Sequence, residues 1–271
     1  MNNATANISN GGGGSDEVKP AVYLEQDGNV AELVLNRPLK HNAMTSLMFK
    51  LLRDAQEEIN STKSIHTVIL RGAGERAFCT GTDINTLKEY EDFWDWRNRI
   101  DYVTQIRAIR KPVIAAIKGW ALGGGHELAV AADIRIAARS AVFAAPEIRL
   151  GWVGAGGTSQ YLPRLLGYGQ AMRILLTGDH ISADEAFRIG LIEELVDDGQ
   201  ELIRARALAK QIASYSPIAT QATKAAVRAG MSGNLDMGLQ IENELMALCF
   251  AAGNDKAGAQ LFGERVKSDK K

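Results

Sequence analysis

Alternating hydrophobic and polar positions near the start of the chain have the two-residue period of a half-buried strand. Val22–Gln26 and Val30–Leu35 fit this pattern, and the intervening Asp27-Gly28-Asn29 is typical of a hairpin turn. The period then becomes helical from Asn42 onward. Apolar residues recur there at spacings of three and four, on one face of the predicted helix: Met44, Leu47, Leu51, Leu52, Ala55 and Ile59.

Short apolar runs and helical segments continue along the chain. Strands are expected at Thr67–Leu70, Val113–Ile117, Ile134–Ala137 and Val142–Ala144. Helical periodicity marks Leu87–Arg110, through Phe93, Trp96, Ile100, Val103 and Ile106, and also Gly124–Ala131. After Gly157 the expected helices are 158–166, 170–176, 183–189, 201–215, 218–230, 235–252 and 256–266. Strand–helix alternation followed by helices alone predicts an α/β core with a helical C-terminal region.

The N-terminal segment has a different composition from the rest of the chain. It is rich in Asn, Ser and Gly, as flexible linkers are. We therefore expect a disordered tail at 1–19, an α/β core at 20–200 and a helical region at 201–271. The tail lacks the basic start and apolar run of a secretory signal. Because eighteen apolar residues never run uninterrupted, no membrane span is expected, and a cytoplasmic location is predicted.

Composition excludes several classes of protein. The 271 residues are 46% hydrophobic and 23% charged, as in ordinary globular proteins. The net charge of −1 argues against nucleic acid or an anionic membrane as the main partner. Cys79 and Cys249 are too far apart in sequence for a C-x-x-C site, and two cysteines make no disulfide framework.

Familiar metal and nucleotide motifs are missing from the sequence. Gly154–Gly157 lacks the spacing of a dinucleotide-binding loop, and there is no phosphate loop or nucleophile elbow. His126-Glu127 would need a second histidine at position 130, which is Val130. We therefore expect no metal and no bound cofactor.

One glycine-rich turn combines several features of a reactive site. A buried strand leads into Gly123-Gly124-Gly125, a helix begins there, and Glu127 follows in its first turn. Free N–H groups and the helix dipole at such a turn can hold a developing oxyanion. Glu147 follows another strand and a proline, and two carboxylates beside an oxyanion hole suffice for proton transfer next to a carbonyl. The same residues also fit a plain turn with a dipole-compensating glutamate, so the residue pattern alone leaves both interpretations open.

Three segments together are similar to the crotonase superfamily, also called the enoyl-CoA hydratase/isomerase family. They are Ala77–Ile84, Lys111–Glu127 and Phe143–Gly151, in this order. The opening Asn36-Arg37-Pro38 with Asn42-Ala43-Met44 resembles the family's N-R-P…N-A-L pattern. This resemblance implies a spiral of repeated β-β-α units. It also implies C-terminal helices that build a trimer, two of which stack into a hexamer.

The resemblance further implies a reaction and its residues. The substrate would be an acyl-CoA thioester, with coenzyme A entering only as part of it. The leading hypothesis is a 2-enoyl-CoA hydratase. The backbone N–H groups of Thr82 and Gly124 would form the oxyanion hole. Glu127 would activate water for attack at Cβ, and Glu147 would protonate Cα.

Other residues are expected to bind the substrate or its coenzyme A. They are Arg37, Lys40, Thr80, Asp83, Ile84, Trp120, Gly123, Trp152 and Ala155. Trp120 and Trp152 flank the two catalytic loops, and Tyr90, Phe93, Trp94, Trp96 and Tyr102 follow Ile84. These aromatic residues fit a pocket for a bulky acyl group, but Phe93, Trp96 and Ile100 also have the spacing of helix packing. His126 is expected on a helix surface or at an interface.

Departures from the family pattern keep alternatives open. Asn85 stands where the family often has a lysine near the coenzyme A phosphates, so Lys40, Arg37 or the basic C-terminal residues Arg265 and Lys267 would have to compensate. After Gly151 the family's proline is missing and the glycines are displaced by one. That loop helps to hold the catalytic water, so isomerase or thioester or C–C hydrolase chemistry is the nearest alternative. Ala155 argues against a dienoyl-CoA isomerase, and the two glutamates argue against a non-catalytic acyl-CoA-binding protein.

Overall fold

The computed structural model describes residues 19–254. Residues 1–18 of the expected tail, the helix expected at 256–266 and the basic residues Arg265 and Lys267 lie outside that range. Within it, no helix is both long enough and apolar enough to cross a membrane.

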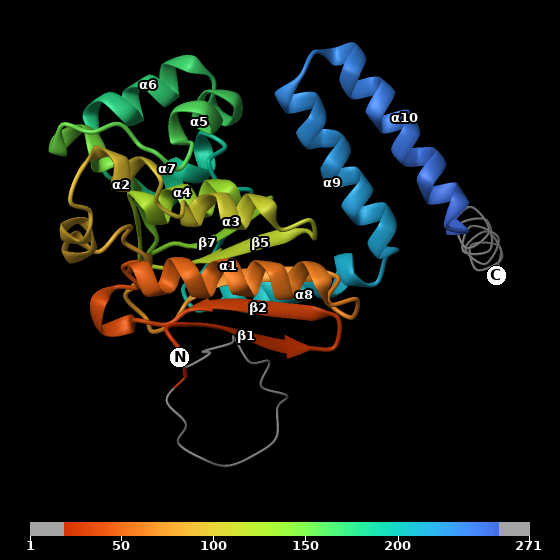
Figure 1. Cartoon of the computed structure of the whole chain (residues 1–271), viewed down its shortest axis with the longest axis horizontal. Coiled ribbons are helices and arrows are strands. Elements are labelled where there is room, and N and C mark those ends of the chain that lie inside the picture. The colour runs from red at the N-terminus through yellow and green to blue at the C-terminus, as the bar shows by residue number, and fades with distance from the viewer. Residues whose placement is uncertain (1–18, 255–271) are drawn as a thin grey trace.

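Within residues 19–254, ten strands form two sheets (Figure 1). The six-stranded sheet has the order β1-β2-β3-β5-β7-β10, and the four-stranded sheet has the order β4-β6-β8-β9. The strands are β1 Val22–Asp27, β2 Val30–Leu35, β3 Thr67–Gly72, β4 Ala77–Cys79, β5 Val113–Ile117, β6 Trp120–Leu122, β7 Ile134–Ala138, β8 Val142–Ala144, β9 Ile181–Ser182 and β10 Glu194–Val196. The expected hairpin is confirmed, because β1 and β2 pair antiparallel with Asp27 opposite Val30.

A β-β-α unit repeats along the core. β3, β5 and β7 lie in the large sheet, and the strand that follows each of them, β4, β6 or β8, lies in the small sheet. Helical elements then follow each pair. They are η2 Ile84–Glu89, α2 Phe93–Arg97 and α3 Tyr102–Ala108 after β4, α4 Gly124–Ala131 after β6, and η3 Pro146–Leu150, α5 Thr158–Leu166 and α6 Tyr168–Thr177 after β8. The predicted α/β architecture is therefore confirmed.

The first helix, α1 (Ser46–Ser61), begins later than predicted. Thr45 caps it by accepting a hydrogen bond from the Met48 N–H. Asn42 does not open the helix, because its backbone is left-handed (φ 55°) and its buried side chain bonds to other segments. The buried face of α1 is the predicted one at Leu51, Leu52, Ala55 and Ile59. In its first turn, however, Leu47 is 58% exposed, and Met48 and Phe49 are buried instead.

The helical segment predicted at Leu87–Arg110 is broken into η2, α2 and α3. Asp92 and Asp101 are the physical reason, because each side chain caps the helix that follows it. Val103 and Ile106 pack in the core as expected. Phe93 does not, because it is 73% exposed on α2.

The C-terminal helices divide into two groups (Figure 1). α8 (Glu201–Ala213) packs on β3, β5 and β7, where its Ala205 and Ala209 join a cluster with Ile69 and Ile114 of the large sheet. α9 (Pro217–Ser232) and α10 (Leu235–Ala251) form a helical hairpin that extends away from the body. The projecting hairpin therefore begins at Pro217. Between β9 and β10 lies the short α7 (Ala183–Arg188).

Candidate active site

The start of α4 presents one of the two expected oxyanion donors. β6 ends at Leu122, and Gly123 then donates its N–H to Ala144 O of β8 (2.9 Å), which fixes the turn against the small sheet. Gly124 is the first residue of α4, so its own N–H has no partner within the helix. All of α4 is buried, which carries Glu127 into the interior.

The segment after β4 presents the other donor, Thr82. Two hydrogen bonds fix the chain on either side of it: Met44 N–H to Gly81 O and Asp83 N–H to Met44 O, both 2.8 Å. Among the hydrogen bonds of residues 19–254, none uses the Thr82 N–H. The Thr82 and Gly124 N–H groups are therefore both available to a ligand.

Tyr102 connects these two donor segments, a role that the sequence did not indicate. Its hydroxyl lies 3.1 Å from the Thr82 Oγ1. A β-carbon on Gly124 would stand only 1.7 Å from that hydroxyl, so only glycine fits there. The ring is buried and stacks on Phe49 with a centroid distance of 4.7 Å. The contact arises because α3 packs on α4, and no local sequence signal reports that packing.

Glu127 is held by the loop between Gly151 and α5. The Gly156 N–H donates to Glu127 Oε1 (2.6 Å), and Thr158 Oγ1 donates to the same oxygen (3.2 Å). A β-carbon on Gly156 would stand 2.4 Å from Oε2, so this close approach requires glycine. Oε1 is therefore fixed, while Oε2 accepts no hydrogen bond from the part of the chain that the structure describes.

The second carboxylate lies at the same turn. Glu147 is in the first turn of η3 and is half-buried. Its Oε1 stands 3.3 Å from where a β-carbon on Gly123 would be. Glu127, Glu147 and the two free N–H groups thus gather around Gly123 and Gly124.

Burial sets the acidity of both glutamates. It raises the pKa of Glu127 to about 7. The hydrogen bond from the Gly156 N–H lowers that pKa, and the nearby charge of Glu147 raises it. Burial also raises the pKa of Glu147. A pKa near neutrality is suited to proton transfer, because such a group can both accept and release a proton under working conditions.

The polar residues expected to bind substrate are partly engaged within the fold. Arg37 forms an ion pair with Asp83 (3.1 Å) and also donates to Ala43 O. Thr80 donates its hydroxyl to His41 O (3.3 Å). Three other expected residues are exposed at the surface: Lys40, Ile84 and Ala155.

The aromatic residues lie mostly at the surface. Trp152 is half-exposed, and its backbone N–H donates to the backbone oxygen of Glu147 (3.0 Å). The centroid of the Trp120 ring is 5.4 Å from that of His180. Trp96 packs against Tyr90 and Arg99 rather than in the core. Helix packing in the core is therefore the wrong interpretation for Trp96, as it is for Phe93.

His126 is not on a surface, contrary to expectation. It is fully buried, and its ring meets Phe143 edge-on at 6.1 Å. Neither ring nitrogen has a hydrogen-bond partner among residues 19–254. Burial lowers its pKa to about 4, so the ring is neutral at physiological pH. The prediction failed because α4 is enclosed on all sides. Within the described residues, no group of three or more His, Cys, Asp or Glu could hold a metal ion.

Comparisons with known proteins agree with this geometry. The family model for enoyl-CoA hydratase/isomerase matches residues 25–271. The chain is 38% identical to a short-chain-enoyl-CoA hydratase of Clostridium acetobutylicum, over 91% of this chain and 95% of that protein. It is 35% identical to an (E)-benzylidenesuccinyl-CoA hydratase of Thauera aromatica, over 90% and 96%. The crystal structure of an enoyl-CoA hydratase from Bacillus anthracis superimposes with a TM-score of 0.84 at 35% identity, covering 91% of this chain and 97% of that one.

Proposed function

This chain belongs to the enoyl-CoA hydratase/isomerase family, and we propose that it is a 2-enoyl-CoA hydratase, a lyase that adds water across the C2–C3 double bond of an acyl-CoA thioester. One observation carries the proposal. Among the described residues, Glu127 has one carboxylate oxygen fixed by two hydrogen bonds and the other without one, and Glu147 lies beside Gly123, next to the unused Gly124 N–H.

The two N–H groups account for activation of the thioester. Its carbonyl oxygen would accept hydrogen bonds from Thr82 and Gly124. These bonds strengthen as negative charge develops on that oxygen in the enolate, and the dipole of α4 acts in the same direction. Loss of one such donor typically costs about 3 kcal/mol of transition-state stabilisation.

The carboxylates account for the two proton transfers. Glu127, through Oε2, takes a proton from water as the water oxygen attacks Cβ. Glu147 gives its proton to Cα as the enolate collapses, so the substrate gains one water and the thioester bond stays intact. The proton on Glu127 then returns to Glu147 to close the cycle. This sequence draws on no cofactor beyond the coenzyme A that the substrate carries.

The coenzyme A phosphates need a cation that the fold has not already paired. The guanidinium of Arg37 is paired with Asp83, which makes it a support for the donor segment. We therefore assign phosphate contact to the exposed Lys40.

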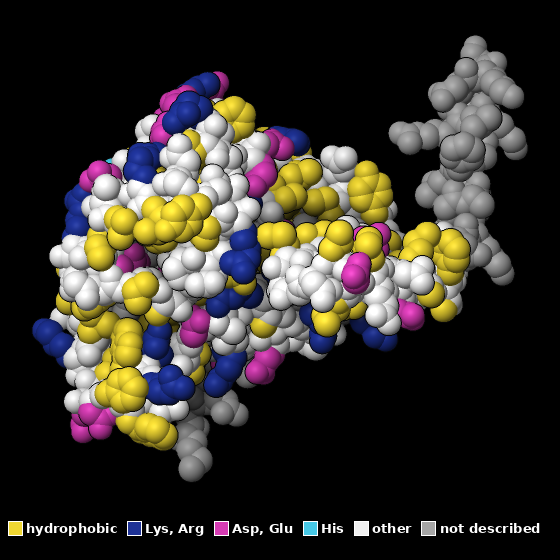
Figure 2. Space-filling model, turned by 90° about the horizontal axis from the view of Figure 1, so that it is seen from above, with side chains coloured by type: hydrophobic (Ala, Val, Ile, Leu, Met, Phe, Trp, Pro, Cys, Tyr) yellow, Lys and Arg dark blue, Asp and Glu magenta, His cyan; other side chains and the backbone are white. Residues whose placement is uncertain are grey.

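The projecting hairpin supports self-association. Figure 2 shows hydrophobic side chains exposed along it. They belong to both helices and are about half or more exposed: Val227, Leu235, Met237, Leu239, Met246, Leu248 and Phe250. A single chain leaves this apolar surface in water, so we assign it to contacts between copies in a trimer or a dimer of trimers.

A cytoplasmic location is part of the same proposal. Both Cys79 and Cys249 are free thiols and buried. Free thiols are the usual state of cysteine in a reducing compartment.

A hydration assay tests the function. The purified protein is offered straight-chain and aryl-substituted 2-enoyl-CoA thioesters. The conjugated-alkene absorbance is followed, and products are weighed by mass spectrometry. We expect the mass of one water to be gained. Glu127→Gln and Glu147→Gln should each lower kcat by about 10²–10⁴-fold, because each removes one proton-transfer step.

A matched control uses the same substitution away from the site. Glu89→Gln, at an exposed position in η2, should keep wild-type turnover. Three outcomes would contradict the proposal: a shifted alkene of unchanged mass, free coenzyme A released without hydration, or full turnover in both catalytic-site variants. The preferred thioester reports whether the site takes a bulky acyl group.

A further inference from the structure

Arg107 is a basic residue in the last turn of α3 that the proposed reaction does not use. Its Nη1 donates to the carbonyl oxygen of Gly156. Its Nη2 donates to Thr104 Oγ1 (2.9 Å) and pairs with Asp101 (3.5 Å). The guanidinium also lies 5.5 Å from the ring centroid of Tyr161 on α5. The side chain is therefore fixed between α3 and the loop that precedes α5.

Gly156 is the residue through which this anchor reaches the site. Its carbonyl accepts from Arg107, and its N–H donates to Glu127 Oε1. The segment Gly154–Gly157 contains three glycines, which leave the backbone many accessible conformations. The N-cap of α5 is Gly157, which has no side chain that could bond to the first turn of the helix. The direction of the Gly156 N–H thus depends on groups outside the loop, and Arg107 supplies one.

We propose that Arg107 is a positioning residue of the active site, which orients Glu127 by anchoring Gly156. Arg107 touches no reacting atom and acts only through that loop. The inference rests on the proposed function in one respect, namely that Glu127 is the base.

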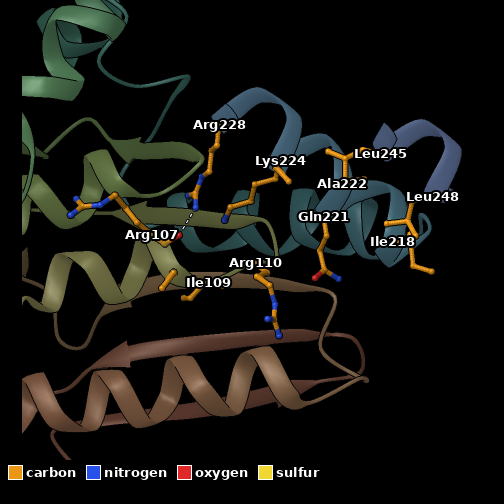
Figure 3. A pocket seen from close by; sticks show the side chains of 12 residues that line it. Arg107, Ile109, Arg110, Ile218, Gln221, Ala222, Lys224, Arg228, Leu245 and Leu248 are labelled. Carbon is orange, nitrogen blue, oxygen red and sulfur yellow. Dashed lines mark hydrogen bonds between the residues drawn. The ribbon is translucent and has the colours of Figure 1, made fainter. Parts of the chain in front are cut away.

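The hairpin supports the anchor from the other side. Arg228 of α9 donates to the backbone carbonyl of Arg107 and pairs with Asp133 (3.1 Å). Lys224, one turn earlier, pairs with the same carboxylate (2.6 Å). Figure 3 shows Arg228 reaching from α9 to the end of α3, across a cavity of about 400 Å³, while the Arg107 side chain points away from that cavity. The end of α3 is therefore held in place on the side opposite the loop.

Several groups around Glu127 raise or lower its pKa, and together they determine which way that pKa moves when Arg107 is replaced. Glu147 of η3 and Asp101 at the start of α3 raise its pKa, while the Gly156 N–H and the Thr158 hydroxyl lower it. Tyr102 on α3 and His126 on α4 are uncharged near neutral pH. Removing the Arg107 guanidinium weakens the hydrogen bond from Gly156 to Glu127, takes away a positive charge and leaves Asp101 without its ion-pair partner. All three changes favour the protonated form of Glu127.

Arg107→Met tests the proposal through a pH profile. Because the base must be ionised, the acidic limb of kcat/KM should move to higher pH by about one unit, as expected for losing one hydrogen bond to a carboxylate. At neutral pH kcat should fall about fivefold, with KM changed by less than about threefold, and activity should recover at alkaline pH. Arg107→Lys, which keeps a donor and the charge, should restore most of the wild-type profile.

Arg110→Met is the matched control. Arg110 lies just beyond the same end of α3, but its side chain points toward α1 (Figure 3) and donates to Asn60 O (3.3 Å). Its removal should leave the pH profile unchanged. An Arg107→Met profile with the wild-type acidic limb, or a loss of equal size at every pH, would overturn the proposal. Arg107→Gln replaces the methionine variant if thermal unfolding shows that the latter does not fold.

A measurement without turnover separates this inference from the proposed function. Titration of the Glu127 carboxyl by ¹³C NMR, assigned by its loss in Glu127→Gln, reports the same shift in Arg107→Met. A protein that hydrates no thioester but shows the shift contradicts the function and keeps the inference. An active protein whose Glu127 titration is the same in both forms contradicts the inference alone.

Discussion

At the scale of single residues, Glu127 combines recognisable chemistry with an environment that the sequence does not reveal. Its place after three glycines at a helix start marks it as a site candidate. Its fixed Oε1, its burial and its neighbour Glu147 come from three other segments of the chain. Tyr102 and His126 make the same point, because the hydroxyl contact of one and the enclosure of the other follow from helix packing.

A buried glutamate with a raised pKa should cost stability when it ionises. The pKa of Glu127 is raised from 4.5 to about 7 in the folded state. The contribution of this carboxyl to the free energy of unfolding is therefore fully present below pH 4.5 and is lost as pH rises through 7. Glu127→Gln, which cannot ionise, should therefore be more stable than wild type at alkaline pH. The gain should grow between about pH 4.5 and 7 and reach about 3 kcal/mol.

Urea unfolding at fixed protein concentration, between pH 5 and pH 8.5, measures this difference. Glu147→Gln offers a graded comparison, because that carboxyl is less buried and its gain should be smaller. A Glu127→Gln variant whose advantage does not change with pH would show that Glu127 is not held in a desolvated site.

At the scale of elements, Asn42 shows how one side chain redirects a helix start. Its amide nitrogen donates to Ala73 O (3.0 Å), Ala77 O (2.9 Å) and Phe78 O (3.2 Å), and its oxygen accepts from the Arg37 N–H (2.9 Å). These bonds join the segment before α1 to β4 and to the turn between β3 and β4. β4 leads directly into the Thr82 donor, so Asn42 supports the site as well as the fold.

Asn42→Ala should lower the free energy of unfolding by about 2–4 kcal/mol. The change leaves buried carbonyl groups without a donor and puts alanine at a left-handed backbone position. Asn36→Ala is the control, because among the described residues that amide donates only to Lys19 O and Pro20 O at the edge of the molecule. This change should cost less than about 1 kcal/mol. Equal urea midpoints for the two variants would contradict this account.

At the scale of the whole molecule, the hairpin of α9 and α10 is the part that a single chain does not complete. Its helices pack extensively on each other. α9 is tied to the body through Lys224 and Arg228, which pair with Asp133 and donate to the backbone carbonyls of Lys111 and Arg107. The exposed apolar residues lie along the rest of it. The shape therefore predicts an assembly in which other copies cover the hairpin.

Leu239→Glu with Met246→Glu should break that assembly. Both side chains are 54% exposed on α10, and charges there would have to be desolvated in an interface. Light scattering coupled to size exclusion should give the wild type a mass roughly three or six times the 29.3 kDa of one chain, and the variant the mass of one chain. Leu39→Glu, on the body and 93% exposed, should not change the mass. A wild type that runs as a single chain would refute the assembly.

The sequence by itself determined the features that depend on neighbours in the chain. Hydrophobic period fixed the β1–β2 hairpin, the buried strands β5 and β7, and the late helices, because each period is a local property. The motif order indicated the family and both glutamates. β8 was predicted, but the other strands of two or three residues, β4, β6, β9 and β10, carry no usable period and were not predicted.

Tertiary structure alone decided how these parts meet. The small sheet brings the ends of β4, β6 and β8 together, and so sets Thr82, Gly124 and Glu147 at one place. The packing of α3 on α4 and on the loop at Gly156 introduced Tyr102 and Arg107, which are remote in sequence from the residues they support. Close packing fixes such contacts through the shapes of whole elements, and a pattern read along one chain contains no record of which surfaces will touch.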